Sequence, residues 1–159
     1  MICSVLTAVS IFAGVCSNAV PQAVAGKPPS FSVELARSMI NKHRANHGLG
    51  PLAIDRRLMA SAKAHSKDLA RRGSITHRGS DGSYPKDRAR RQGYKPRLAS
   101  ENVAAGYHQT SDVINGWKGS RGHNENLLRR GAKHMGMALV YKPNVGKETY
   151  WTLVIGTPR

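Results

Sequence analysis

The sequence predicts an α+β domain in which helices cover a small antiparallel sheet. Segments with apolar residues at helical spacing fill the first two-thirds of the chain. The tail changes period, because "HMGMALVY" and "ETYWTLVIG" are β-prone runs joined by the turn-forming "KPNVGK", which predicts a hairpin. Helices followed by strands favour the α+β class. A length of 159 residues, with 40% hydrophobic and 21% charged residues, fits one globular domain.

The first 25 residues differ in composition from the rest, because all 25 Lys and Arg and all 9 Asp and Glu lie after them. The apolar run 2–15 and the small residues "AVA" before Gly26 predict a secretory signal peptide over 1–25, cleaved near Ala25-Gly26. A linker over 26–32 and a domain over 33–159 would follow. We therefore expect a secreted or periplasmic protein, with no transmembrane helix in the mature form because the apolar run is short.

No basic residue follows Met1, which departs from the usual signal peptide and leaves an uncleaved anchor as an alternative. A lipoprotein attached through Cys16 is a weaker alternative. Both cysteines, Cys3 and Cys16, lie in this segment, so the mature chain would have no disulfide. The domain must then be stabilised by its core, which suits a bacterial exported protein.

Two amphipathic helices are predicted first. One begins after a Ser32 cap and ends at Gly48, and the other follows Pro51 and Asp55 and ends at Gly73. Their inward positions are Leu35, Ala36, Met39 and Ile40 in the first helix, and Leu58, Ala62, His65 and Leu69 in the second. On this apolar face His65 is expected to be a neutral, hydrogen-bonded core residue.

The middle of the chain predicts short elements separated by turns. In order they are a loop over 74–85, a helix from Pro85 to Gly93, an extended or irregular segment over 98–106, a helix capped by Thr110 or Ser111, and a brief helix ended by Gly131.

Three residues are candidates for chemistry. His77 and His123 each lie in a glycine-rich, turn-prone segment, and loops on a rigid scaffold often carry functional sites. Glu101 is the only acid between Asp87 and Asp112 and stands among small and apolar residues, so its carboxylate needs a partner. Their spacing is long-range, so local geometry does not prove a cluster.

Several sequence blocks resemble the CAP superfamily, also called SCP-like or PR-1-like, in its short bacterial secreted type. The blocks are "ITHRGSDGSYPKDRARRQGY", "SENVAAG", "GWKGSRGHNENLL", "MGMALVY" and "YWTLVIG", in the family's order from about Leu35 to Gly156. The resemblance implies an α-β-α sandwich with a central cleft whose floor carries two histidines and two acids. It assigns His77 and His123 as the histidines and Glu101 as the first acid.

The second acid of the family is missing, because Ser120 stands in its place three residues after Trp117. Two imidazoles and one carboxylate remain, from His77, Glu101 and His123. They make the ligand set of an open zinc site, so the resemblance implies a weakly bound divalent metal. Asn102, beside the carboxylate, is expected to bond backbone and hold the cleft loops.

Other residues near these blocks have structural interpretations. Trp117 is expected in the core, Asn126 is expected to bond backbone near the cleft, and Arg88 is expected to pair with Asp81 or Asp87.

The net charge of +16 favours an anionic glycan or lipid surface as partner, although it equally fits a soluble protein from a basic proteome. We expect a monomer that binds no specific nucleic acid. The first functional hypothesis is an exported module that binds a cell-envelope or extracellular ligand, whether lipid, glycan or divalent metal.

Two alternatives to the binding module stay open. One is a metal-dependent, peptidase-like hydrolase that uses the same cleft. The other, weaker one is a secreted nuclease, because "SRGHNEN" is superficially similar to a nuclease motif, but Ser120 stands where that motif has its acid. Whether the protein is an enzyme therefore stays open.

Overall fold

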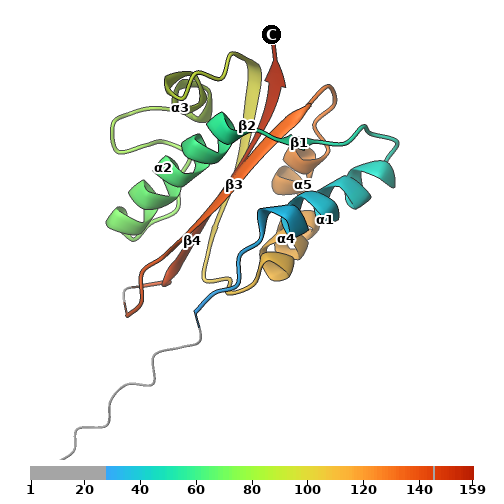
Figure 1. Cartoon of the computed structure of the whole chain (residues 1–159). Helices are drawn as coiled ribbons and strands as arrows, with labels where there is room; N and C mark the ends of the chain where they lie inside the picture. Colours follow the sequence, from blue (N-terminus) through green and yellow to red (C-terminus); the bar gives the residue numbers. More distant parts are fainter. Residues whose placement is uncertain (1–27, 145) are drawn as a thin grey trace, which may run out of the picture.

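The computed structural model describes residues 28–144 and 146–159, so the predicted signal peptide and the first linker residues lie outside the described residues. A four-stranded sheet, in the order β1-β3-β4-β2, forms the middle of the domain (Figure 1). Its strands are β1 (Ala53–Ile54), β2 (Pro96–Ala105), β3 (His134–Tyr141) and β4 (Thr149–Pro158). The helices are α1 (Val33–Ala45), α2 (Arg56–Arg72), α3 (Pro85–Arg91), α4 (Thr110–Gly119) and α5 (Arg121–Leu127).

Helices cover both faces of the sheet, which confirms the α+β class and the α-β-α layering. On one face, α1, α4 and α5 pack Ile40, Trp117 and other apolar residues onto the sheet. On the other face, α2 and α3 pack Leu58 and Ala89 against Val154 of β4 (Figure 1). The core position predicted for Trp117 is confirmed, since the residue is 2% exposed.

The predicted hairpin is confirmed: β3 and β4 pair antiparallel, and β4 also pairs antiparallel with β2. The segment 98–106, predicted as extended or irregular, belongs mostly to a ten-residue edge strand, β2. Glu101 and Asn102 lie opposite Val154 and Leu153 of β4 in this register. Because neighbouring side chains in a strand point to opposite faces, Glu101 faces the α2–α3 layer and Asn102 faces the α4–α5 layer.

The first two helices begin as predicted. Ser32 accepts a hydrogen bond from the Leu35 amide at 3.1 Å, and Asp55 accepts from the first amides of α2. Gly73, with φ of 66°, ends α2 in the left-handed conformation that glycine adopts at low cost. The helix α1 ends at Ala45, somewhat before Gly48.

Two predicted helix boundaries are wrong. Gln109, and neither Thr110 nor Ser111, is the N-cap of α4. The Thr110 hydroxyl instead accepts from the Ser32 amide and donates to the Ser30 carbonyl, so it ties down the segment before α1.

The end of α5 is the second wrong boundary, because this helix ends at Leu127 and does not reach Gly131. The guanidinium of Arg44, from α1, donates to the Leu127 carbonyl at 2.8 Å and the Arg129 carbonyl at 3.2 Å. Arg44 is 1% exposed, so this buried group takes up carbonyls that a longer helix would have bonded internally.

Within residues 28–144 and 146–159, no helix is long and apolar enough to cross a membrane.

Candidate functional site

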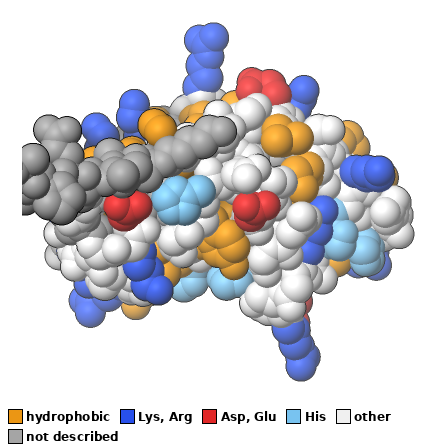
Figure 2. All heavy atoms as spheres, turned by 90° about the horizontal axis from the view of Figure 1, so that it is seen from below, with side chains coloured by type: hydrophobic (Ala, Val, Ile, Leu, Met, Phe, Trp, Pro, Cys, Tyr) orange, Lys and Arg blue, Asp and Glu red, His pale blue; other side chains and the backbone are white. Residues whose placement is uncertain are grey.

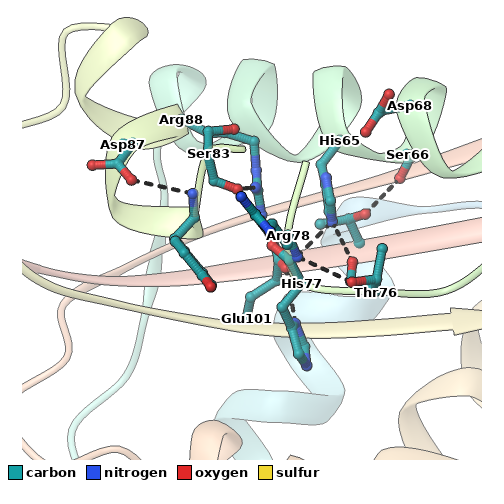
Figure 3. A network of polar contacts seen from close by, with 12 residues as sticks. His65, Ser66, Asp68, Thr76, His77, Arg78, Ser83, Asp87, Arg88 and Glu101 are labelled. Carbon is teal, nitrogen blue, oxygen red and sulfur yellow. Dashed lines mark hydrogen bonds and ion pairs between the residues drawn. The ribbon is translucent and has the colours of Figure 1, made fainter. Parts of the chain in front are cut away.

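The centre of the candidate site is the buried carboxylate of Glu101 on β2, whose side chain is 1% exposed. Figure 3 shows groups from α2, α3 and the loop after α2 converging on it. Oε2 of Glu101 accepts a hydrogen bond from Nη2 of Arg88 at 2.6 Å. Arg88 also donates to the Ser83 carbonyl at 2.7 Å and the His77 carbonyl at 3.1 Å, so it fixes the loop between α2 and α3.

The predicted pairing of Arg88 with Asp81 or Asp87 is wrong. Asp81 pairs with Arg91, and Asp87 accepts from the Tyr84 amide at the start of α3. Arg88 points inward from α3 and is only 6% exposed, so it meets the one buried carboxylate on β2. A buried charge requires such a partner.

His77 is hydrogen-bonded to the second oxygen of the same carboxylate. Its Nδ1 donates to Oε1 of Glu101 at 3.0 Å, and half of its side chain is exposed. The hydrogen bond with Glu101 raises the pKa of His77 above its ordinary value, although partial burial opposes this. The structure thus brings together His77 and Glu101, with Nδ1 of the ring fixed by the carboxylate.

His65 is a third neighbour of this carboxylate, which the sequence did not assign to the site. The prediction of a hydrogen-bonded core histidine is confirmed, since His65 is fully buried and its Nε2 donates to the Thr76 carbonyl at 2.8 Å. The same nitrogen lies 3.5 Å from Oε1 of Glu101. Burial lowers the pKa of His65, so the ring is neutral at pH 7. The apolar face of α2 gave no sign of a carboxylate opposite it.

His123 lies on α5, in the opposite helical layer. Its Nδ1 is 2.9 Å from the hydroxyl of Ser120, the residue that stands in place of the second family acid. Burial lowers the pKa of His123, and the charge of His77 lowers it further. The two imidazoles come from different layers of the fold, His77 from the loop after α2 and His123 from α5.

Two asparagines fasten α5 to β2. Asn102 donates to the His123 carbonyl at 3.0 Å, which confirms that it holds backbone. Asn126 donates to the Glu101 carbonyl at 3.0 Å and lies 2.9 Å from Oδ1 of Asn102. The backbone of His123 is therefore fixed relative to Glu101 through short, buried or half-buried bonds.

The donors suit an imidazole site for a divalent cation. In both His77 and His123 the Nδ1 atom is engaged, and no described residue bonds Nε2. Metal-binding histidines commonly have one nitrogen held by a carboxylate or other acceptor while the other nitrogen binds the metal. The described residues contain no group of three or more His, Cys, Asp or Glu placed to hold a metal ion. The three-residue set of His77, Glu101 and His123 stays a prediction.

Comparison with known proteins gives the same fold and family. The family described as "CAP: Cysteine-rich secretory protein family" matches residues 37–155. The protein YkwD of Bacillus subtilis (strain 168) is 30% identical over 112 residues, which are 70% of this chain and 44% of YkwD.

Two solved structures are similar over most of the domain. An extracellular protein with an SCP domain from Bacillus anthracis is 28% identical, with a TM-score of 0.69, over 77% of this chain and 39% of that one. An outer surface protein from Borrelia burgdorferi is 24% identical, with a TM-score of 0.71, over 79% of this chain and 92% of that one. The chain thus spans less than half the length of both Bacillus relatives.

Proposed function

Because the chain belongs to the CAP family of cysteine-rich secretory proteins, we propose that it is an exported binding module that holds a divalent cation, such as zinc, at His77 and His123. The two Nε2 atoms would hold the cation, which would supply a Lewis-acidic centre for an anionic group of a cell-envelope or extracellular ligand. The relatives described above as extracellular and outer surface proteins support export.

One observation carries this proposal: both oxygens of the Glu101 carboxylate are already engaged. Arg88 holds one oxygen and His77 holds the other, and the side chain is almost completely buried. Glu101 therefore orients the His77 ring and keeps its proton on Nδ1. In this proposal it acts as a positioning residue for the imidazole, whereas the family resemblance implied that it is a metal ligand.

The alternative of a metal-dependent hydrolase has less support from the geometry. A general base must reach the proton that it removes, within hydrogen-bond distance. The Glu101 carboxylate already accepts hydrogen bonds from Arg88 and His77, and Nε2 of His65 lies 3.5 Å from its Oε1. Ser120 is bonded to His123, but no described hydrogen bond joins an acid to this pair. The arrangement thus favours binding over catalysis.

The net positive charge of the chain favours an anionic ligand. On the face shown in Figure 2, Lys and Arg side chains project in several directions and acidic side chains are few. The formal net charge is +16. Such a field favours approach of anionic polymers or headgroups.

The test is calorimetric titration of the full chain with Zn²⁺ at neutral pH, with His77→Ala, His123→Ala and Glu101→Gln variants. His108→Ala is the matched control, because His108 is exposed and outside the network. We expect micromolar binding in the parent and the control, and no binding in either site-histidine variant. Binding should be about tenfold weaker in Glu101→Gln, as when other groups that orient a metal-binding histidine are removed.

Absence of zinc binding in the parent would refute the cation site. Binding that survives in His77→Ala or His123→Ala would also refute it. If a folded Glu101→Gln protein loses binding as completely as the histidine variants do, Glu101 is itself a ligand, as the family resemblance implied. Hydrolysis of peptide substrates by the zinc-loaded parent, lost in Glu101→Gln, would favour the hydrolase over the binding module.

A further inference from the structure

Among residues 28–144 and 146–159, a strand pairs with the outer edge of β3 only at its first residues. The two-residue strand β1 pairs only with the start of β3, at His134 and Met135. The Lys142 amide, just after β3, donates to the Glu148 carbonyl. Hydrogen-bonded pairs alternate along an antiparallel ladder, so the even-numbered residues of β3 are those that exchange backbone hydrogen bonds with β4. Odd-numbered residues therefore direct their N–H and C=O groups outward.

In two of these four residues, Met135 and Met137, an outward backbone group has a hydrogen-bond partner. The Met135 carbonyl accepts from the Asp55 amide, and the Met137 amide donates to Sδ of Met59 at 3.2 Å. No strand among the described residues pairs with the following stretch, which contains Leu139 and Tyr141. Their amides and carbonyls form a short open edge of the sheet, and such edges are templates for another strand.

Two adjoining recesses line this edge, between β3 and one flank of α2. The first, of about 360 Å³, is lined by Phe31, Met59, Ala60, Lys63 and residues 137–139. The second, of about 330 Å³, is lined by Lys67, Ala70, Arg71 and residues 140–142. We call these residues together the β3-edge groove. Its α2 residues recur at helical spacing along one flank, so the groove runs along the strand.

The groove is positively charged on the α2 side. Lys63 and Lys67 are exposed on successive turns of α2, and Lys142 follows at the end of β3. None of the three lysines forms an ion pair with a carboxylate in the part of the chain that the structure describes. Arg71, by contrast, is paired with Asp68.

The opposite side of the groove is apolar. Phe31 is 37% exposed and packs edge-on against Trp151 at 5.8 Å between ring centroids. Leu139, which packs with the core on that face, lies beside it. A strand added to this edge would therefore present alternate side chains to lysines and to an apolar surface.

We propose that the β3-edge groove binds an extended acidic peptide, which adds a strand to the sheet beside β3. Its backbone bonds to Leu139 and Tyr141, its acidic side chains meet Lys63, Lys67 and Lys142, and its alternate apolar side chains meet Phe31 and Leu139. A second copy of this chain is a poor occupant, because the same three lysines would face each other. The groove is independent of the His77 site, since β4 separates β3 from β2.

The test is titration of the full chain with a synthetic seven-residue peptide of alternating Glu and Val. Calorimetry measures the binding, and amide hydrogen exchange measures the protection of backbone amides. Three probes serve as comparisons: the alternating Lys and Val peptide, the Glu and Val peptide N-methylated at alternate residues, and vesicles of anionic lipid. We expect binding of the acidic peptide alone, with slowed exchange at the Leu139 and Tyr141 amides.

The variant for this test is the double substitution Lys63→Glu with Lys67→Glu, on the exposed flank of α2. Its matched control is Lys86→Glu with Lys95→Glu, which changes the net charge equally but lies outside the groove. We expect at least about tenfold weaker peptide binding in the groove variant, because several exposed charge pairs become repulsive. The control should bind as the parent does.

Equal binding by parent and groove variant would overturn the proposal. So would binding of the N-methylated peptide as tightly as its parent peptide, or no binding of the acidic peptide at about 1 mM, where affinity is already weak. Capture by anionic vesicles that depends on Lys63 and Lys67, without peptide binding, would make the groove a lipid contact and refute the peptide site.

Discussion

Glu101 and Arg88 form a buried ion pair, in which Oε2 lies 2.6 Å from Nη2 and the side chains are 1% and 7% exposed. This pair joins β2 to α3 and, through the Ser83 and His77 carbonyls, to the loop that carries His77. The position of the His77 imidazole therefore depends on a charge that has been removed from water. Removing one partner leaves the other charge buried and uncompensated.

Arg88→Met is expected to lower the free energy of unfolding by roughly 3–5 kcal/mol, the range for breaking a buried pair. The measurement is urea unfolding of the full chain at pH 7. Arg90→Met is the matched control, since Arg90 is on the same helix, is about half exposed and should change stability by less than about 0.5 kcal/mol. An Arg88→Met protein as stable as the Arg90→Met protein would contradict the structural role of the pair.

The pKa values of His77 and His123 are expected to lie on opposite sides of the ordinary histidine value of about 6.5. The hydrogen bond to Glu101 raises the pKa of His77, whereas burial and the charge of His77 lower that of His123. NMR titration of the imidazole protons measures both. In Glu101→Gln the pKa of His77 should fall, while His123 should move less; a rise at His77 would show that the carboxylate does not hold it.

The same shifts predict the pH dependence of stability. Protonated His77 is favoured by folding, so its contribution is complete below pH about 6.5 and is lost as pH rises through its raised pKa. His123 acts oppositely, because folding favours its neutral ring, and its contribution is lost as pH falls below about 6.5. The free energy of unfolding should be measured against pH for the parent, His77→Ala and His123→Ala. The differences of the two variants from the parent should change with pH in opposite directions.

Asp68 should make the fold sensitive to acid. Burial alone would raise its pKa, but bonds from Ser80 and Arg71 outweigh this and lower it to about 2. The stability from this carboxylate is thus present above pH about 4 and is lost as pH falls toward the lowered pKa. Unfolding at stepped pH should show the loss in the parent and a smaller one in Asp68→Asn. Equal acid sensitivity in the two proteins would contradict the prediction.

Gly136 is expected to tolerate no side chain, because a Cβ there would lie 2.2 Å from backbone atoms of Leu58 and Met59 on α2. Gly136→Ala should lower the free energy of unfolding by about 3 kcal/mol or more, since backbone must shift to make room. Gly119→Ala is the control, because nothing lies within 4 Å of its added Cβ, and it should be neutral or stabilising. Similar stability of the two variants would show that α2 moves away from β3 easily.

The sequence predicted more of the fold than of the site. The caps at Ser32 and Asp55, the stop at Gly73 and the terminal hairpin depend on residues close together in the chain, and all are confirmed. The end of α5 was misplaced because Arg44, which lies 83 residues before the carbonyl of Leu127, terminates it. No local pattern contains that information.

By itself, the sequence determined the class of fold and the order of its helices and terminal hairpin, and it singled out His77, Glu101 and His123 as candidates. Only the tertiary structure decided which charge meets Glu101, because Arg88 has acids nearer in sequence that remain at the surface or serve caps. The physical reason is burial: the carboxylate on β2 faces the α2–α3 layer and must be compensated there. Local periodicity shows that a residue points inward, whereas its partner depends on how the layers pack.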